Sequence, residues 1–217
     1  MCAKKKKMKI QTVLISFIIL VIGCQSNPKS LRDYEEVNKI FQEKEIEDLE
    51  RIVDFFNESI CKSEKLENTN VLDCYELYFK RMRKAEETGI VEIQIPYQEQ
   101  EKLMREIDLN SFNQIWSYGK TWRKNSDTLE VVNIKYDGKY IKFLKEFGKE
   151  NIKAKNYVDR FEAVGDISPS MFADVLMNYK EYDVRDERIK LLIAIHYLTQ
   201  NEQYKIHEKL NSAHNNG

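Results

Sequence analysis

The stretch from Leu191 to Leu198 constrains the fold of this 217-residue chain most, because it is apolar on nearly every side. Its residues read LLIAIHYL, in which His196 is the one strongly polar side chain. A helix that is apolar nearly all round is buried on most of its sides. We therefore expect a helix here, capped by Asp183, at the centre of the C-terminal half.

The rest of the chain after residue 30 has the pattern of amphipathic helices. Apolar residues recur at intervals of three and four, and the whole chain contains only 7 Gly and 3 Pro. Charged residues make up 33% and gather on the opposite faces, which is typical of helices and not of a disordered or all-β chain. We predict a mostly α fold: a single helical domain of about seven to eight helices over residues 31–211, with one or two short extended segments and a disordered tail at 212–217.

Capping residues and glycines divide this domain into helices. Ser30 and Asn70 are typical N-caps, Gly165 is a typical stop, and Ser168 followed by Pro169 is the clearest helix start in the chain. The expected helices are 31–60, 71–88, 97–107, one that starts at Asn110 or Ser111, 151–164, 169–179 and one that follows Asp183.

Two segments have extended character. Ile90–Ile95 alternates apolar and polar residues and ends at Pro96. Thr128–Tyr136 has strand composition and meets Asp137-Gly138, a pair that favours a hairpin turn. Apolar residues then step by three and four, so Thr128–Leu144 is either a hairpin or a strand followed by a helix. We favour the helix, capped near Asp137.

The first 24 residues carry an export pattern. Five lysines between Lys4 and Lys9 precede the run Val13–Ile22, which is apolar except for Ser16. A membrane-spanning helix needs about 20 such residues, so this run has the length of a signal-peptide core. It ends in the sequence Val-Ile-Gly-Cys, with the cysteine at position 24.

This ending resembles the lipobox of bacterial lipoproteins, an aliphatic residue, a variable one, a small one and then Cys, although Val21 stands where Leu is commoner. The resemblance implies that residues 1–23 are a signal peptide, that Cys24 carries acyl chains, and that residues 24–30 form a tether. Two or more acyl chains give a lasting membrane anchor. The alternatives are an ordinary cleaved signal or a short uncleaved anchor. By the same resemblance, Gln25 permits sorting to the periplasmic face of the outer membrane in a diderm bacterium.

The charge balance limits the partners. The five lysines lie before Cys24 and no acidic residue does, so removing residues 1–23 leaves 30 basic against 36 acidic residues, a net charge of −6. An acidic domain of this kind is not expected to bind nucleic acid. The membrane is therefore a partner through the lipid anchor, and the other expected partner is an envelope or periplasmic protein.

The four cysteines suggest one disulfide. Cys2 is lost with the signal and Cys24 is lipidated, which leaves Cys61 and Cys74. Cys61 ends one arm of a predicted helical hairpin and Cys74 begins the other, and exported proteins keep disulfides. Two buried thiols are the alternative.

Candidate site residues are few. Gly165, Asp166 and Ser168 form the best candidate binding loop, because the helix start leaves N–H groups free for an anion or a partner's carboxylate. Trp116, Tyr118 and Trp122 are a candidate aromatic patch for sugar or protein contacts, with core packing as the favoured alternative.

We expect no catalytic residue, no metal site and no cofactor from the motifs. His196 has no second metal ligand at helical spacing. Ser168, Asp166 and His196 could be imagined as a catalytic triad, but Ser168 is not in the Gly-x-Ser-x-Gly turn that carries a hydrolase serine. The favoured interpretation is a non-catalytic binding protein of the envelope, either an inhibitor of the immunity type or an accessory subunit. The alternative is an envelope enzyme that acts on peptidoglycan or another periplasmic substrate.

Overall fold

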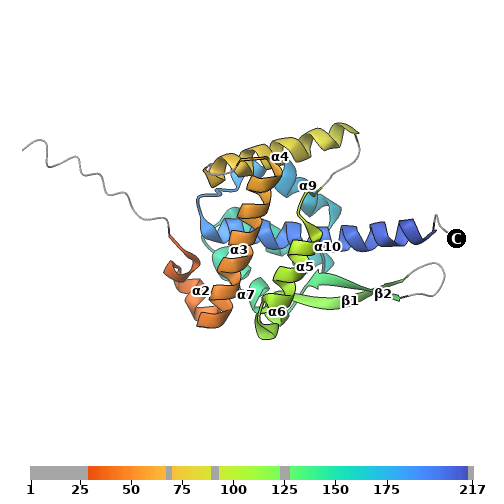
Figure 1. Cartoon of the computed structure of the whole chain (residues 1–217). Coiled ribbons are helices and arrows are strands. Elements are labelled where there is room, and N and C mark those ends of the chain that lie inside the picture. Colours follow the sequence, from red (N-terminus) through yellow and green to blue (C-terminus); the bar gives the residue numbers. More distant parts are fainter. Residues whose placement is uncertain (1–28, 67–69, 89–92, 123–127, 215–217) are drawn as a thin grey trace, which may run out of the picture.

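The computed structural model describes residues 29–66, 70–88, 93–122 and 128–214, which form nine α-helices, two short 3₁₀ turns and one two-stranded sheet (Figure 1). The prediction of a mostly α single domain is confirmed, and its buried apolar side chains form one continuous core. The elements in chain order are η2 Leu31–Asp33, α2 Glu35–Ile40, α3 Glu43–Ser63, α4 Val71–Thr88, α5 Tyr97–Glu106, α6 Leu109–Ile115, β1 Trp116–Trp122, β2 Thr128–Ile134, α7 Lys139–Phe147, α8 Ile152–Val164, α9 Pro169–Met177, η3 Tyr179–Glu181 and α10 Glu187–His214.

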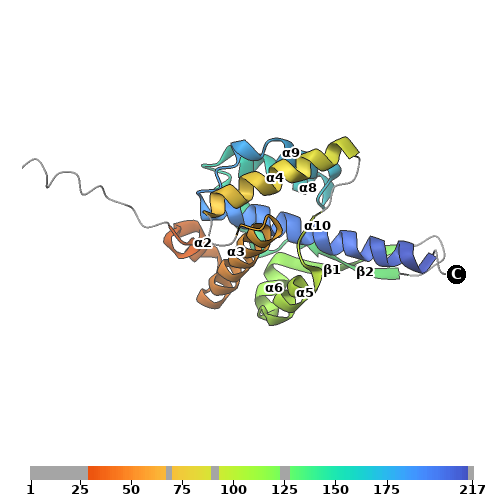
Figure 2. The ribbon, with the colours of Figure 1, turned by 45° about the horizontal axis from the view of Figure 1, so that its top comes forward.

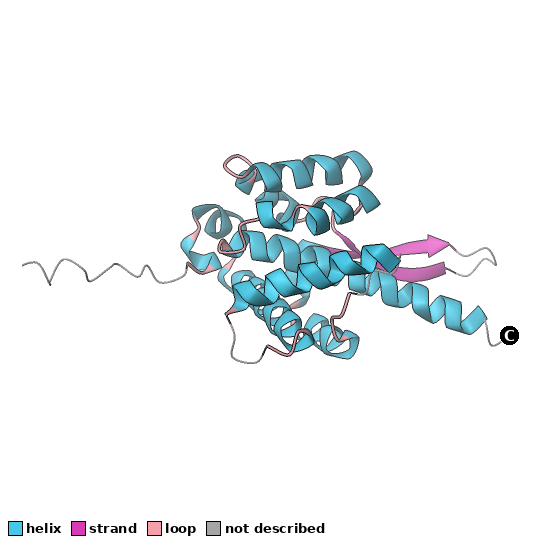
Figure 3. Cartoon of the chain, turned by 90° about the horizontal axis from the view of Figure 1, so that it is seen from above, coloured by secondary structure: helices cyan, strands magenta, loops and turns pink. Residues whose placement is uncertain are grey.

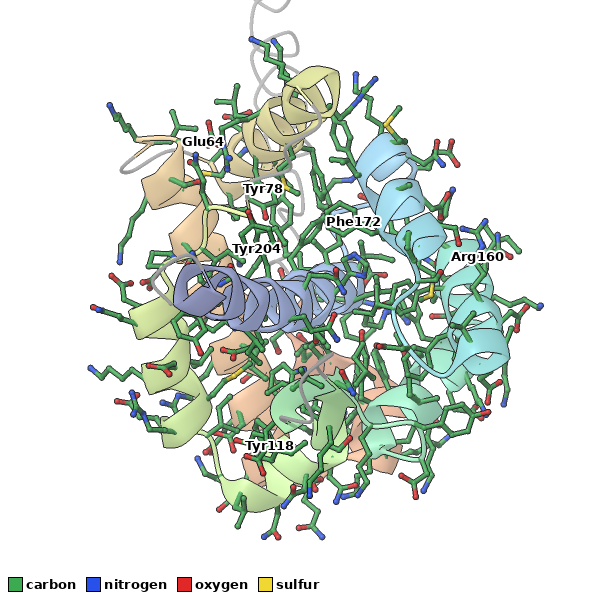
Figure 4. All side chains as sticks on the ribbon, turned by 90° about the vertical axis from the view of Figure 1, so that its right-hand side faces the viewer. Glu64, Tyr78, Tyr118, Arg160, Phe172 and Tyr204 are labelled. Atoms are coloured by element: carbon green, nitrogen blue, oxygen red, sulfur yellow. A yellow bond between two sulfur atoms is a disulfide. The ribbon has the colours of Figure 1, made fainter. Side chains whose placement is uncertain are left out.

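Helix α10 runs through the middle of the molecule, with α4, α8 and α9 on one side and α5, α6 and the hairpin on the other (Figure 2). Seen along its axis, α10 is surrounded by the other elements (Figure 4). Every side chain from Leu191 to Leu198 is fully buried. The predicted central helix therefore organises the whole domain and not only its C-terminal half.

The helix expected from residue 31 to 60 is wrong in one respect, because it is broken into η2, α2 and α3. Phe41 and Gln42 have extended backbone angles, and the backbone N–H of Gln42 donates to the Glu45 carboxylate at 2.7 Å, which starts a new helix. The break lets Phe41 pack against Phe143 of α7, with ring centroids 6.0 Å apart, while α3 turns away to cross α10 (Figure 1). The helical spacing of Val37 and Phe41 continues across the break and hides it in the sequence.

The sheet is an antiparallel pair, with Trp116 opposite Ile134 and Trp122 opposite Thr128. Strand β2 and the following helix α7 confirm the strand-then-helix alternative for Thr128–Leu144. Strand β1 was not predicted, because Phe112, Ile115 and Trp116 have helical spacing in the sequence. The hairpin projects from the body beside the C-terminal half of α10 (Figures 1 and 3), where the Gln203 side chain donates to the Val132 carbonyl at 3.3 Å.

Several helix ends follow the predicted caps. Asn70 accepts from the Leu72 N–H at 3.1 Å, Ser168 accepts from the Met171 N–H at 3.3 Å, and Gly165 ends α8 with a positive φ of 81°.

Other ends need correction. Asp108, and not Asn110 or Ser111, caps α6 by accepting from the Asn110 N–H at 2.8 Å. Asp186 caps α10 by accepting from the Arg188 N–H at 2.9 Å, whereas Asp183 accepts from Arg185 in the preceding turn. In these turns several polar residues could serve as caps, and the packing of the chain selects one.

Two predicted segments lie partly outside the described residues. Residues 93–96 form no strand, and the beginning of the expected extended segment is not described. Helix α10 continues to His214, so residues 212–214 belong to it and only 215–217 of the predicted tail lie outside. The predicted signal peptide at residues 1–23, the predicted lipidation site Cys24 and residues 25–28 are also outside the described residues.

Candidate binding sites

A disulfide joins Cys61, near the end of α3, to Cys74, in the first turn of α4, with their Cα atoms 4.9 Å apart. Cys74 is fully buried and Cys61 packs against the core. The bond fixes the start of α4 to the end of α3. It thereby also positions Leu72, Tyr75 and Glu76, which form one wall of a pocket described below.

The three candidate aromatic residues do not form one exposed patch. Trp116 is fully buried, and its indole N–H donates to the Thr199 hydroxyl on α10 at 2.8 Å. Tyr118, two residues along β1, is 65% exposed and stacks on Phe112 with ring centroids 5.4 Å apart (Figure 4). The Trp122 side chain lies outside the described part. Strand alternation thus makes Trp116 a core residue and leaves Tyr118 at the surface.

The candidate loop uses its polar groups locally. The Asp166 carboxylate accepts from the Ile167 N–H at 2.7 Å, and the Ser168 hydroxyl both caps α9 and lies 2.9 Å from the Ser170 hydroxyl. Gly165, Asp166 and Ser168 line neither of the two pockets described below. The polar side chains of this loop are therefore used in local hydrogen bonds, and its geometry gives no sign of a bound ligand.

His196 is a core residue. It is fully buried on α10, and its Nδ1 lies 3.1 Å from the Tyr157 hydroxyl. Burial lowers the pKa of His196 to about 3, so the ring is neutral at physiological pH. A neutral histidine sealed in the core does not exchange protons with a substrate.

A pocket of about 400 Å³ lies at the start of the described chain, between residues 29–31 and α3. We call it the tether pocket. It is lined by Lys29, Ser30, Leu31, Glu50, Val53, Asp54, Asn57 and Glu187. Its carboxylates dominate its charge, and two of them are already paired: Glu50 with Arg32 at 3.0 Å and Glu187 with Lys190 at 2.6 Å.

Asp54 is the carboxylate of the tether pocket that has no ion pair among the described residues. Asp54 is exposed at the pocket, where partial burial raises the pKa of its carboxyl and the nearby charges of Glu50 and Glu58 raise it further. A carboxyl with a raised pKa in a pocket is a candidate proton donor. It could also receive a cationic group from a partner.

A second pocket of about 400 Å³ lies between the first turns of α4 and the chain that connects α9 to α10. We call it the tyrosine pocket, because Tyr75, Tyr179 and Tyr182 line it together with Leu72 and Val184. The Tyr179 ring stacks on Phe79 of α4 at 4.8 Å, and the Tyr182 hydroxyl donates to Asp174 at 3.0 Å. Both outer tyrosines are thus held in place by contacts away from the pocket.

Sequence reasoning missed both pockets. The two walls of the tyrosine pocket are separated by about a hundred residues, and no spacing motif joins them. The weak signal that existed was the run Tyr179–Arg185, which holds two tyrosines and four charged residues between two helices.

The described residues contain neither a metal-binding group nor a membrane-spanning helix. No three His, Cys, Asp or Glu side chains among them are grouped as metal ligands. No helix in the part of the chain that the structure covers is long and apolar enough to span a bilayer. Comparison with protein-family models, with curated proteins and with solved structures found no match to this chain.

Proposed function

We propose that this chain is a bacterial lipoprotein whose domain binds an envelope protein without catalysing a reaction. It acts as an inhibitor of the immunity type or as an accessory subunit of a membrane-bound complex. The lipobox-like ending at Cys24 supports the anchor, and the net charge of −6 after removal of residues 1–23 argues against a nucleic-acid partner.

One observation carries the proposal: the chain joins the domain only a few residues after Cys24. Leu31 is buried in the core, and the Lys29 ammonium lies 5.2 Å from the centroid of the Tyr34 ring. The five residue-to-residue steps from Cys24 to Lys29 can span at most about 17 Å when fully extended. A lipidated Cys24 therefore holds the domain close to the bilayer, with the tether pocket on the membrane side.

This short tether selects the kind of partner. A domain held within about 17 Å of the surface can reach membrane proteins and their surface loops, but it cannot reach across the envelope. The tether pocket, with the unpaired carboxylate of Asp54, suits a basic residue close to the membrane surface of such a partner. In a diderm bacterium, Gln25 permits sorting to the periplasmic face of the outer membrane.

The test begins with the anchor and continues with the partner. Mass spectrometry of the N-terminal peptide should show acyl chains on Cys24, and Cys24→Ser should abolish both acylation and membrane attachment. Crosslinking in the native membrane, followed by pull-down, should then recover one protein at near-equal stoichiometry. A Cys24→Ser chain that still carried acyl chains and stayed on membranes would contradict the anchor.

An envelope enzyme that acts on peptidoglycan is the second candidate, and Asp54 is the observation that favours it. Asp54 lines a pocket with Glu50, and its pKa is raised, which is the direction that a general acid requires. Incubation with cell-wall fragments, analysed by mass spectrometry, would release products with the native protein and none with Asp54→Asn. If both proteins leave the fragments unchanged while a stoichiometric partner is recovered, the binding function stands.

A further inference from the structure

Tyr75, which lines the tyrosine pocket, has a buried hydroxyl without a hydrogen-bond partner among the described residues. Tyr75 is only 1% exposed, and its hydroxyl has no partner among the described residues. Burial raises the pKa of Tyr75 well above its ordinary value of 10, so the hydroxyl stays protonated and can donate. The hydroxyls of Tyr78 and Tyr197 are also unpaired in the described part, but neither residue lines the pocket. Tyr75 is thus a residue of the aromatic lining whose own hydroxyl is buried and unpaired in the described part.

The mouth of the pocket carries one unpaired charge of each sign. Asp183 and Arg185 bind each other, with N–O distances of 2.7 and 2.8 Å, and Glu181 is paired with Lys153. Glu76 and Lys180 also line the pocket and are exposed, and neither has an ion pair within the described ranges. The Lys180 ammonium lies over the Tyr179 ring, 6.0 Å from its centroid.

These features of the tyrosine pocket all suit one kind of ligand. Tyrosine rings and aliphatic side chains favour an apolar group, and the unpaired cation and anion favour a ligand with a carboxylate and an ammonium. The volume of about 400 Å³ is at the small end of the range for small-molecule sites.

We propose that the tyrosine pocket binds a small zwitterion with an apolar side chain, namely an amino acid or a dipeptide. The carboxylate of the ligand pairs with Lys180, its ammonium pairs with Glu76, and its side chain lies against the tyrosines. This ligand site goes beyond the protein partner proposed above and is independent of the lipid anchor.

The test is a titration of the full lipidated protein in mild detergent with the dipeptide Ala-Phe, followed by calorimetry. N-acetyl-Ala-Phe lacks the ammonium and Ala-Phe amide lacks the carboxylate, so each should bind about threefold to fivefold more weakly, as expected for one exposed charge pair. Lys180→Met should weaken Ala-Phe by the same factor and should leave the affinity for Ala-Phe amide unchanged. Glu76→Gln should likewise weaken the binding of Ala-Phe by this factor and should leave the affinity for N-acetyl-Ala-Phe unchanged.

Lys142→Met is the matched control, since Lys142 on α7 is also exposed and lies outside the pocket. It should bind Ala-Phe as the native protein does. The proposal is overturned if Ala-Phe does not bind at millimolar concentration, or if the blocked dipeptides bind as well as the free one. In either case, recovery of the protein partner by crosslinked Lys180→Met protein shows that the proposed function survives without the ligand site.

Discussion

At the scale of single residues, His196 is the clearest case in which burial changes the pKa of a side chain. It lies on the most deeply buried part of α10, and the only hydrogen bond of its ring nitrogens within the described residues joins Nδ1 to the Tyr157 hydroxyl. Because burial lowers the pKa of His196 from 6.5 to about 3, the unfolded chain takes up a proton before the folded one does.

This histidine gives a signed prediction for stability against pH. The contribution of the neutral His196 to the unfolding free energy is fully present above pH 6.5. As the pH falls from 6.5 towards 3, the unfolded chain binds the proton and the unfolding free energy decreases by at most about 1.4 kcal/mol per pH unit. His196→Phe should therefore reduce the slope of unfolding free energy against pH in this window, measured by urea unfolding at several pH values. Tyr157→Phe is the control, because it removes the hydrogen bond but keeps the buried ring and the slope. Equal slopes for native protein and His196→Phe would show that the histidine is not sealed from water.

Two glycines are required for different reasons. A Cβ at Gly138 would lie 2.3 Å from the carbonyl oxygen of Gln114, so Gly138→Ala should destabilise the fold by about 1–3 kcal/mol through overpacking. A Cβ at Gly165 meets nothing within 4 Å, but its φ of 81° disfavours a side chain, so Gly165→Ala should cost about 1 kcal/mol. Thermal unfolding of both variants checks these values. A Gly138→Ala protein as stable as the native one would mean that α6 and α7 approach less closely.

The residues of the candidate sites were predictable only where a local pattern decides their environment. Tyr118 and Trp116 could not be separated, because the alternation that buries one and exposes the other belongs to a strand that forms only through pairing with β2. The tyrosine pocket needs the start of α4 to lie beside η3, and that packing is made by the stacking of Phe79 on Tyr179. Neither fact is encoded in spacing along the chain.

At the scale of elements, the helices that begin and end on local signals were predicted well. Helix α9 starts where Ser168 and Pro169 indicate, and α8 ends at Gly165. The break at Phe41 was missed, because it serves a contact with Phe143 about a hundred residues away. Local capping chemistry is readable in a sequence, whereas a break required by packing is not.

The disulfide belongs to this scale, because it joins two helices. The disulfide closes the loop from Cys61 to Cys74, and closing a loop this short stabilises the fold by about 3 kcal/mol in the chain-entropy model. The double variant Cys61→Ala/Cys74→Ala should therefore lose about 3 kcal/mol of unfolding free energy, measured by urea unfolding. The native protein unfolded in a thiol reductant is the control and should lose a similar amount. If neither change affects the urea midpoint, the bond does not restrain the unfolded chain.

At the scale of the whole molecule, α10 and Arg188 link parts that are distant in sequence. The Arg188 guanidinium lies between the rings of Tyr34 and Phe147, 4.1 and 4.2 Å from their centroids. It also pairs with Glu36 of α2, with Glu150 between α7 and α8, and with Asp186 at the start of α10. Helices α3 and α5 and strand β2 also pack on α10, so this helix contacts elements from both ends of the described domain.

A single central helix predicts cooperative unfolding. Ile193 is fully buried on α10, so Ile193→Ala should cost about 2–5 kcal/mol. In a Trp122→Phe background, Trp116 is the only tryptophan and reports on the hairpin side, while far-ultraviolet circular dichroism reports on all the helices. Both signals should have the same urea midpoint, and Ile193→Ala should lower both equally. Ile152→Ala is the control, because Ile152 is 64% exposed on α8 and its loss should change stability by less than about 0.5 kcal/mol. Separate midpoints for Trp116 and the helices would mean that the hairpin side unfolds on its own, and that α10 does not unite the two layers around it.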